Sequence, residues 1–135
     1  MDIEDKTEIY KLMDMDLQIT GEGEATGVIV VDDRLHSRAG HIHGGMIATI
    51  IDTVMGWAVA SAIEADERPA TVDLHVRYIR PMVDGTLTTK ASVVHKGRTF
   101  TQVSAEAHRD DGKILATADA SFVVRKIAEY RPGRR

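Results

Sequence analysis

A histidine–glycine segment and one aspartate stand out in the sequence as groups that could do chemistry. His43-Gly44-Gly45 precedes a long apolar run, and Asp52 lies inside that run, nine positions after His43. Glycines at the start of a helix leave backbone N–H groups uncovered. Those N–H groups, at the positive end of the helix dipole, suit a developing oxyanion or a polarised carbonyl. The alternative is that the two glycines only let the chain turn tightly into the helix.

Asp52 is the candidate base or nucleophile. The positions that share its helix face are mostly small, and such a face accepts a ligand or another backbone; they are Gly45, Ala48, Thr49, Gly56 and Val59. Its neighbours in the sequence are largely apolar, so the carboxylate is expected to be poorly solvated and therefore a stronger base. The alternative is a structural aspartate that neighbouring hydroxyl groups or a facing N–H satisfy.

A metal centre is not indicated. Zinc needs three or four converging ligands, whereas His41 and His43 are two positions apart and would point oppositely in an extended segment. His36 is close in sequence, but no second cluster accompanies it. The chain has no cysteine, which excludes a cysteine nucleophile and a thiolate metal site. We therefore expect neither a metal nor a separate cofactor.

The element that carries Asp52 is predicted to be a helix over residues 43–65. From Met46 to Ile63 its only polar residues are Thr49, Asp52, Thr53 and Ser61. A run of this length raises the possibility of a membrane span, but an aspartate near its middle would be costly there, and strand-like segments follow. A helix that is apolar nearly all round in a soluble chain is a buried core helix.

The other segments are mostly strands. A short helix is expected in the N-terminal region 1–16, with apolar spacing over 4–16, and strands over 17–19 and 26–31. Four more strands are expected over 71–79, 86–96, 99–109 and 113–125. Residues 71–79 alternate strictly, with Val72, Leu74, Val76 and Tyr78 on one face. Short turns predict an antiparallel meander, curved around the single apolar helix, so the fold class is α+β.

Length and charge predict one soluble domain over 1–135, with a flexible basic tail over 126–135. The net charge is −4, and the only basic run is at the end of that tail. Nucleic-acid binding needs a basic stripe, so we expect no nucleic-acid partner. The acidic residues 1–5 are unlike a signal peptide, and the lack of cysteine is compatible with a reducing compartment. We expect a cytoplasmic protein that does not bind a membrane.

Taken together, these motifs match a family pattern. It consists of His43-Gly44-Gly45, Asp52 nine positions after His43, the strand from Ala70 to Leu74, then Tyr78 and Pro81. The chain resembles the hotdog-fold acyl-CoA thioesterases over about residues 25 to 125, most closely the phenylacetate-degradation (PaaI-like) branch of the 4-hydroxybenzoyl-CoA thioesterase superfamily. The resemblance implies a sheet wrapped around the helix, edge-to-edge dimers or dimers of dimers, and active sites at the subunit interface.

The resemblance also assigns roles in the hydrolysis of an acyl-CoA thioester. Asp52 corresponds to the general base or nucleophile, and the Gly44 N–H to the donor that polarises the thioester carbonyl. His43 corresponds to the histidine that shapes the site, and Thr71 stands where the family has a serine. Plausible contacts with the anionic coenzyme A (CoA) are Gly45, Arg77, Arg80, Lys96 and Arg98. Trp57, Met55 and Tyr78 are the bulky candidates for the pocket walls.

Ser37 departs from the family pattern, because this branch usually has asparagine six positions before the histidine. A serine is shorter and offers no amide, so the family's contact to the reacting water or sulfur is not reproduced directly. This leaves a second hypothesis beside hydrolysis, a non-catalytic acyl-CoA-binding or sensing protein on the same fold. A hydratase ranks lower, because no histidine–carboxylate pair has the spacing of that class.

Overall fold

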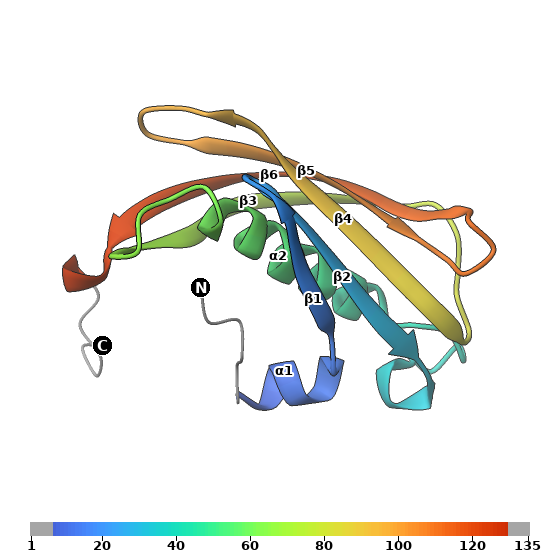
Figure 1. Cartoon of the computed structure of the whole chain (residues 1–135). Coiled ribbons are helices and arrows are strands. Elements are labelled where there is room, and N and C mark those ends of the chain that lie inside the picture. The colour runs from blue at the N-terminus through green and yellow to red at the C-terminus, as the bar shows by residue number, and fades with distance from the viewer. Residues whose placement is uncertain (1–6, 130–135) are drawn as a thin grey trace.

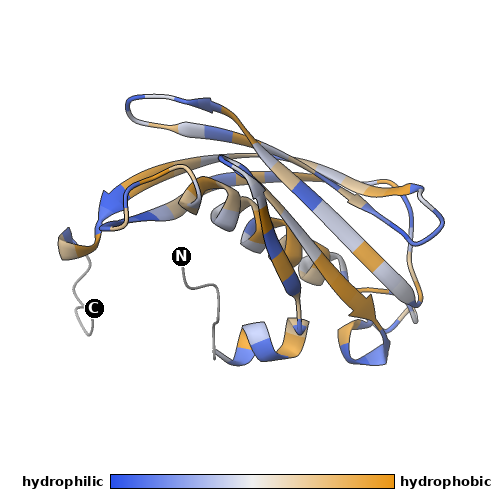
Figure 2. Ribbon diagram, in the orientation of Figure 1, coloured by the Kyte–Doolittle hydropathy of each residue, from blue (hydrophilic) through white to orange (hydrophobic). Residues whose placement is uncertain are grey.

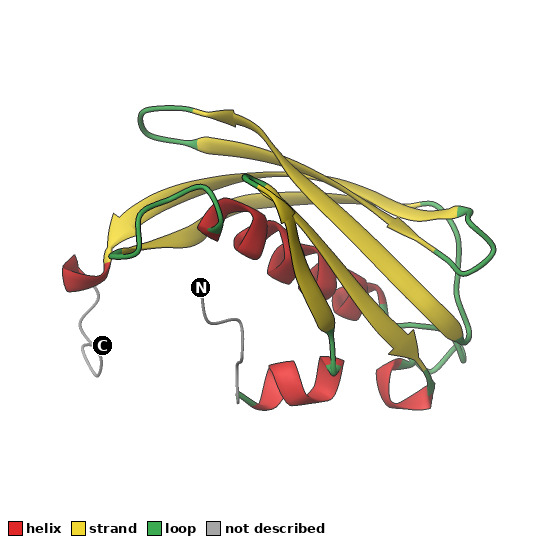
Figure 3. Ribbon diagram, viewed as in Figure 1, coloured by secondary structure: helices red, strands yellow, loops and turns green. Residues whose placement is uncertain are grey.

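A six-stranded antiparallel sheet curves over one long helix, α2 (Gly44–Ala60), in the computed structural model (Figures 1 and 3). The structure describes residues 7–129. The strands are β1 (Asp16–Gly21), β2 (Glu24–Val31), β3 (Glu67–Tyr78), β4 (Gly85–Lys96), β5 (Thr101–His108) and β6 (Ile114–Lys126). The shorter helices are α1 (Glu8–Met13), η1 (Asp33–Leu35) and η2 (Ile127–Glu129). The predicted α+β class, with a curved sheet around a central helix, is confirmed.

Helix α2 packs one apolar face against the concave side of the sheet. The residues on that face recur every three or four positions and are buried. They are Ile47, Ile50, Ile51, Val54, Met55, Ala58 and Val59. Small residues on the sheet let the helix approach closely. A Cβ added to Gly27 of β2 would lie 2.7 Å from Cγ2 of Val54 and 2.6 Å from Sδ of Met15. Figure 2 shows the hydrophobic residues along α2 and the hydrophilic ones at the sheet's turns.

The strand order corrects the predicted meander. The order across the sheet is β1-β2-β4-β5-β6-β3, so β3 pairs with β6 and lies three positions from β4. Three strand spacings amount to roughly 14 Å, and the connection over residues 79–84 can span about 20 Å. Short connections therefore did not require β3 and β4 to be neighbours. Met82 is buried in this connection, which ties the crossing segment to the core.

A bulge in β3 corrects the predicted strict alternation. Thr71 pairs with Phe122, but Asp73 pairs with Ser121, so Val72 is an extra residue on this strand. Thr71 therefore shares the face of Phe122 toward the helix, together with Leu74 and the residues that alternate after it. Without the bulge Thr71 would share the outer face of Asp73.

Several predicted boundaries also change. Helix α2 ends at Ala60 rather than near residue 65, because the Ser61 hydroxyl donates to the Ala58 carbonyl and accepts from the Gly23 N–H as the chain turns away. The N-terminal helix is shorter than 4–16, and residues 1–6 lie outside the described part. The tail predicted over 126–135 begins in ordered structure, since Lys126 ends β6 and contacts Asp66; residues 130–135 lie outside the description. Within residues 7–129, no helix is long and apolar enough to span a membrane.

Candidate active site

The first backbone N–H of α2 is uncovered, as the two glycines suggested. The His43 ring caps the helix, with Nδ1 accepting from the Gly45 N–H at 2.8 Å. The His43 carbonyl accepts from Met46 N (2.9 Å) and Ile47 N (3.1 Å). The Gly44 N–H belongs to the same peptide unit and has no hydrogen-bond partner among the described residues. Because hydrogen bonds to a carbonyl polarise its peptide group, the Gly44 N–H is a strengthened, free donor.

The cap also explains the second glycine. A Cβ on Gly45 would lie 3.0 Å from the His43 ring and would disturb the cap. Because the Gly45 N–H is used by His43, Gly45 has no free backbone donor for a ligand. Its role in the structure is to make room for the capping imidazole.

Tyr78, at the end of β3, fixes the start of the helix. Its hydroxyl donates to the Gly44 carbonyl at 2.8 Å, and its ring lies 3.5 Å from the position of a Cβ on Gly44. These contacts join the end of an edge strand to the residue with the free N–H. The two residues also line a small pocket of about 330 Å³, together with His41, Ile42, Ile47, Ile79, Arg80 and Pro81.

Ser37 lies in the loop before α2, and its hydroxyl makes local contacts. It donates to the His41 carbonyl at 3.2 Å and accepts from the Ala39 N–H at 3.3 Å. The Ser37 N–H also donates to the His41 carbonyl, at 2.8 Å. These bonds hold the turn over residues 37–41, and they are sufficient to explain a serine at this position.

Asp52 projects from α2 toward the edge strand β3. Its Oδ1 accepts from the Thr71 hydroxyl at 2.7 Å, and the bulge in β3 is what turns Thr71 toward it. Asp52 is half-buried, whereas Ile51 and Val54 are fully buried on the sheet side of the helix. The expectation that apolar neighbours surround the carboxylate is therefore wrong, because sequence neighbours on a helix point in different directions.

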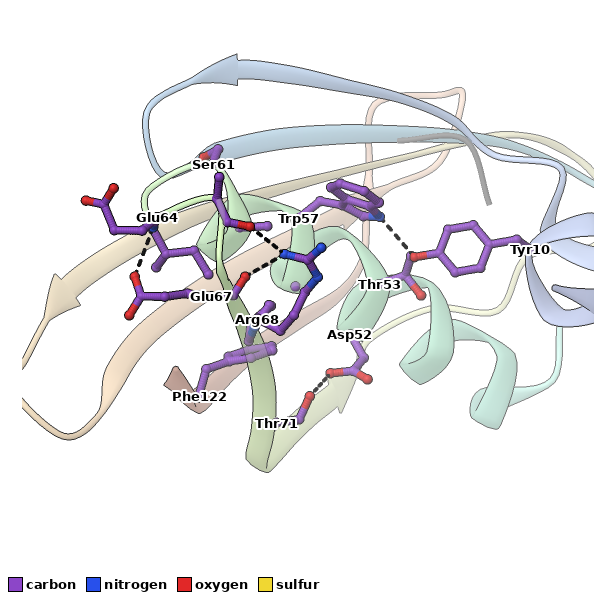
Figure 4. Close-up of a pocket in the computed structure, with 15 residues that line it drawn as sticks. Tyr10, Asp52, Thr53, Trp57, Ser61, Glu64, Glu67, Arg68, Thr71 and Phe122 are labelled. Atoms are coloured by element: carbon purple, nitrogen blue, oxygen red, sulfur yellow. Dashed lines mark hydrogen bonds between the residues drawn. The ribbon is translucent and has the colours of Figure 1, made fainter. Parts of the chain in front are cut away.

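A pocket of about 810 Å³ opens beside Asp52 (Figure 4). Asp52 and Thr71 line one part of it, and Trp57, Phe122 and Tyr10 supply aromatic walls. Three of the chain's six aromatic residues therefore meet at this pocket. Its remaining lining residues are Thr53, Gly56, Ala60, Ser61, Ile63, Glu64, Ala65, Glu67, Arg68 and Pro69. The lining thus combines apolar side chains with polar and charged ones, which suits a small molecule that has both apolar and polar parts.

Of the predicted wall residues, only Trp57 lines this pocket. Met55 is fully buried in the core, and Tyr78 lines the smaller pocket at the other end of the helix. Tyr10 and Arg68 were not among the predicted site residues. Tyr10 showed only helical spacing in the sequence, and Arg68 stands just before the strand segment that carried the family pattern. Arg68 projects into the pocket in Figure 4, and its Nη1 donates to the carbonyls of Ala65 and Glu67.

Asp52 and Gly44 do not meet within one chain. Eight residues along an α-helix amount to about 12 Å along its axis and roughly 80° around it. A donor and a base must each lie within about 3 Å of one reacting carbonyl group, so a short aspartate side chain cannot close this gap. The two groups line different pockets, which leaves each half of the candidate site incomplete.

The predicted CoA contacts are dispersed over the molecule. Arg80 lines the small pocket beside Gly44 and donates to the Ile114 carbonyl. Lys96 donates to the Ala62 carbonyl near the other end of α2, at 2.7 Å, and Arg98 is exposed in the β4–β5 turn. Arg77 pairs with Thr117 on the outer face of the sheet. One chain therefore does not gather these cations into a single phosphate site.

The histidines before α2 do not converge either. His36 Nε2 lies 2.6 Å from the Val83 carbonyl oxygen, and His41 Nδ1 lies 3.2 Å from the Ile42 carbonyl oxygen. The His43 ring is occupied by the helix cap. In residues 7–129, no group of three or more potential ligands from histidine, cysteine, aspartate and glutamate could hold a metal ion.

Sequence comparisons place this chain in a family. Residues 39–116 match the model of the Thioesterase superfamily. A Saccharolobus solfataricus protein, provisionally named an esterase, is 30% identical over 117 residues, which cover 87% of this chain and 83% of that protein. The medium/long-chain acyl-CoA thioesterase of Salmonella typhimurium is 29% identical over 96 residues, which cover 62% of each chain. The chain belongs to the thioesterase superfamily.

Solved structures show the same fold. The PaaI protein of the Escherichia coli phenylacetic acid degradation operon superposes with a TM-score of 0.77 at 22% identity, covering 84% of this chain and 81% of PaaI. A Bacillus halodurans protein solved with CoA gives a TM-score of 0.79 at 26% identity, covering 89% and 77% of the two chains. These neighbours confirm the predicted hotdog fold.

Proposed function

We propose that this protein hydrolyses an acyl-CoA thioester to the free acid and CoA. The observation that carries the proposal is the Asp52 carboxylate, oriented by the Thr71 hydroxyl at 2.7 Å beside an aromatic-lined pocket. A carboxylate held in this way can act on a bound electrophile. Membership of the thioesterase superfamily and similarity to an acyl-CoA thioesterase support the thioester as that electrophile.

In the proposed reaction, Asp52 acts as a general base or as a nucleophile. As a base, it takes a proton from a water molecule whose oxygen attacks the thioester carbon; the C–S bond breaks, and the departing thiolate receives a proton. As a nucleophile, a carboxylate oxygen of Asp52 attacks the thioester carbon, and the C–S bond breaks to release the CoA thiolate, which takes up a proton. Water then hydrolyses the resulting mixed anhydride to the free acid and restores the Asp52 carboxylate. In both routes negative charge develops on the carbonyl oxygen, and a Gly44 N–H donates to it. His43 and Tyr78 hold that donor in place.

The proposed site is shared between two subunits. Asp52 and Gly44 of one chain are too far apart to act together, and β3 presents a long open edge at the end of the sheet. An exposed strand edge is a template for pairing with a second copy, and a two-fold axis would make that pairing antiparallel. It would bring the Tyr78 end of one β3 to the Glu67 end of the other. The start of one α2 would thereby approach Asp52 of the second subunit.

Coenzyme A is proposed to enter as part of the substrate, with no additional cofactor. Arg80, next to Gly44, is the best placed of the predicted phosphate contacts, because it lines the pocket at the helix start. Lys96 contacts the Ala62 carbonyl near the opposite end of α2, and Arg98 follows it in the β4–β5 turn. In the proposed dimer, these two cations would contact CoA only if the substrate bound by the second subunit extended to this end of the helix. Arg77 faces away from both pockets, and the Gly45 N–H is occupied.

Release of free thiol from a panel of acyl-CoA substrates tests the proposal. We expect turnover that is saturable in acyl-CoA and that depends on Asp52. Tight binding of acyl-CoA with no release of thiol from any substrate would instead support the non-catalytic binding protein. The non-catalytic alternative arises from Ser37, which stands where the family usually has asparagine and whose hydroxyl makes hydrogen bonds within its own turn.

A further inference from the structure

Gly56 is a glycine that the fold itself does not require. It lies in the middle of α2, one helical turn after Asp52, and it lines the large pocket. The φ angle of Gly56 is not positive, so its backbone conformation does not call for glycine. The only atom within 4 Å of a Cβ added there, outside its helix and chain neighbours, is Cε2 of Phe122, at 4.0 Å. An alanine would fit and would favour the helix more than glycine does, so the free space over Gly56 needs another explanation.

The space directly over Gly56 lies beside two aromatic side chains that the fold holds in place. Trp57 Nε1 donates to the Tyr10 hydroxyl at 2.9 Å, so the indole holds its position and its polar atom is satisfied within the protein. Phe122 is buried beneath the pocket, and Ile63 and Pro69 add apolar lining. The same pocket is also lined by the polar residues Ser61, Glu64, Glu67 and Arg68. The part of the pocket bounded by Gly56, Trp57 and Phe122 therefore suits a hydrocarbon group better than a chain of amides.

We propose that the acyl group of the substrate lies over Gly56, between Trp57 and Phe122, and that the missing side chain at Gly56 determines which acyl groups are accepted. This inference rests on the proposed thioester hydrolysis. The pocket begins at the carboxylate that acts on the thioester carbon, and the acyl chain is bonded directly to that carbon. The pantetheine arm of CoA carries two amide groups, which would lose hydrogen bonds with water against these apolar walls. The expected substrates are apolar acyl groups larger than acetyl.

The test is a series of side chains at Gly56 assayed with acetyl-, hexanoyl- and dodecanoyl-CoA. We expect Gly56→Val to lower kcat/KM at least 10-fold for hexanoyl- and dodecanoyl-CoA and less than twofold for acetyl-CoA, with Gly56→Ala intermediate. Ala60 lies one turn, about 6 Å, further along the helix. Ala60→Val should therefore reduce activity with dodecanoyl-CoA more than with hexanoyl-CoA. Ser92→Val, exposed on β4 outside the pocket, is the control and should leave the selectivity unchanged.

Two results would overturn the inference while leaving the proposed function intact. An equal loss with all three substrates in Gly56→Val would show that the pocket holds the part of CoA common to them. Unchanged kinetics in a Gly56→Val protein of normal melting temperature would show that the acyl group binds elsewhere. Both results require an active wild-type protein and an inactive Asp52→Asn variant. A wild-type protein inactive with every substrate would contradict the proposed function itself.

Discussion

At the scale of single residues, the Thr71–Asp52 pair is the most informative contact in the structure. The hydroxyl donates to one carboxylate oxygen, which fixes the plane of the carboxylate and leaves its second oxygen for a water molecule or a substrate. A hydrogen bond to a charged group contributes about 1.5–3 kcal/mol. Thr71 is thus a positioning residue in the proposed mechanism, since it acts through Asp52.

Thr71→Val should lower kcat about 10-fold with little change in KM, because the carboxylate loses its orienting donor while the pocket keeps its shape. The check is steady-state kinetics with one acyl-CoA substrate. Thr71→Ser, which restores the hydroxyl, should recover most of the activity. Equal activity in the valine and serine variants would show that the hydrogen bond has no role in turnover.

At the scale of elements, the sequence predicted the long helix well and the strand pairing poorly. An unbroken apolar run is a local signal, so α2 and its position before four strands were predictable. The pairing of β3 with β6 depends on contacts between distant segments, and the short connections were compatible with either neighbour. The bulge at Val72 left no local signal, since residues 71–79 alternate in sequence; this is why the direction of Thr71 could not be derived from periodicity.

The candidate site likewise has residues that the sequence predicted and residues that it did not. Gly44 and Asp52 were identified from the helix they share, and the role of Thr71 came only from the family resemblance. Tyr10 and Arg68 were missed, because they join the pocket through tertiary packing that a single sequence does not display. Arg77 and Lys96, two of the predicted phosphate contacts, lie in different parts of one chain and stay predictions.

Close packing between α2 and β2 makes Gly27 sensitive to substitution. Gly27→Ala should destabilise the fold by about 1–3 kcal/mol, the usual cost of overpacking, because its Cβ would overlap Met15 and Val54. Gly56→Ala is a matched control, since its Cβ meets nothing closer than 4.0 Å. Chemical denaturation of both variants measures the difference. Equal stability would show that the helix and the strand can separate without cost.

The β5–β6 turn gives a pH-dependent prediction. The hydrogen bond from Arg109, with a second from the Lys113 N–H, lowers the pKa of Asp111 from 3.8 to about 2. Because the pKa is lower in the folded protein, the stabilising effect is fully present above pH 4 and is lost as the pH falls toward 2. Asp111→Asn should therefore lower the melting temperature slightly at pH 7, and the two proteins should converge near pH 2. A difference independent of pH would contradict this account.

For the whole molecule, the proposed shared active site requires more than one copy of the chain. β3 forms one edge of the sheet, and the half-buried Asp52 of α2 contacts that edge strand through Thr71. Sedimentation equilibrium should give a dimer or a larger even assembly at the concentrations used for kinetics. A chain that is fully active and monomeric under those conditions would contradict the shared site, whatever its substrate.

In the proposed mechanism Asp52 performs the chemistry, and the Asp52→Asn variant separates this role from a structural one. Asparagine keeps the size of the side chain and an oxygen that can accept from Thr71, but it is neither a base nor a nucleophile. We expect kcat to fall by about 10²–10⁴, the range for a positioned general base, with KM and melting temperature nearly unchanged when measured on the same preparation. A variant that loses stability but keeps normal turnover in its folded fraction, or one that is stable and fully active, would contradict the proposed mechanism.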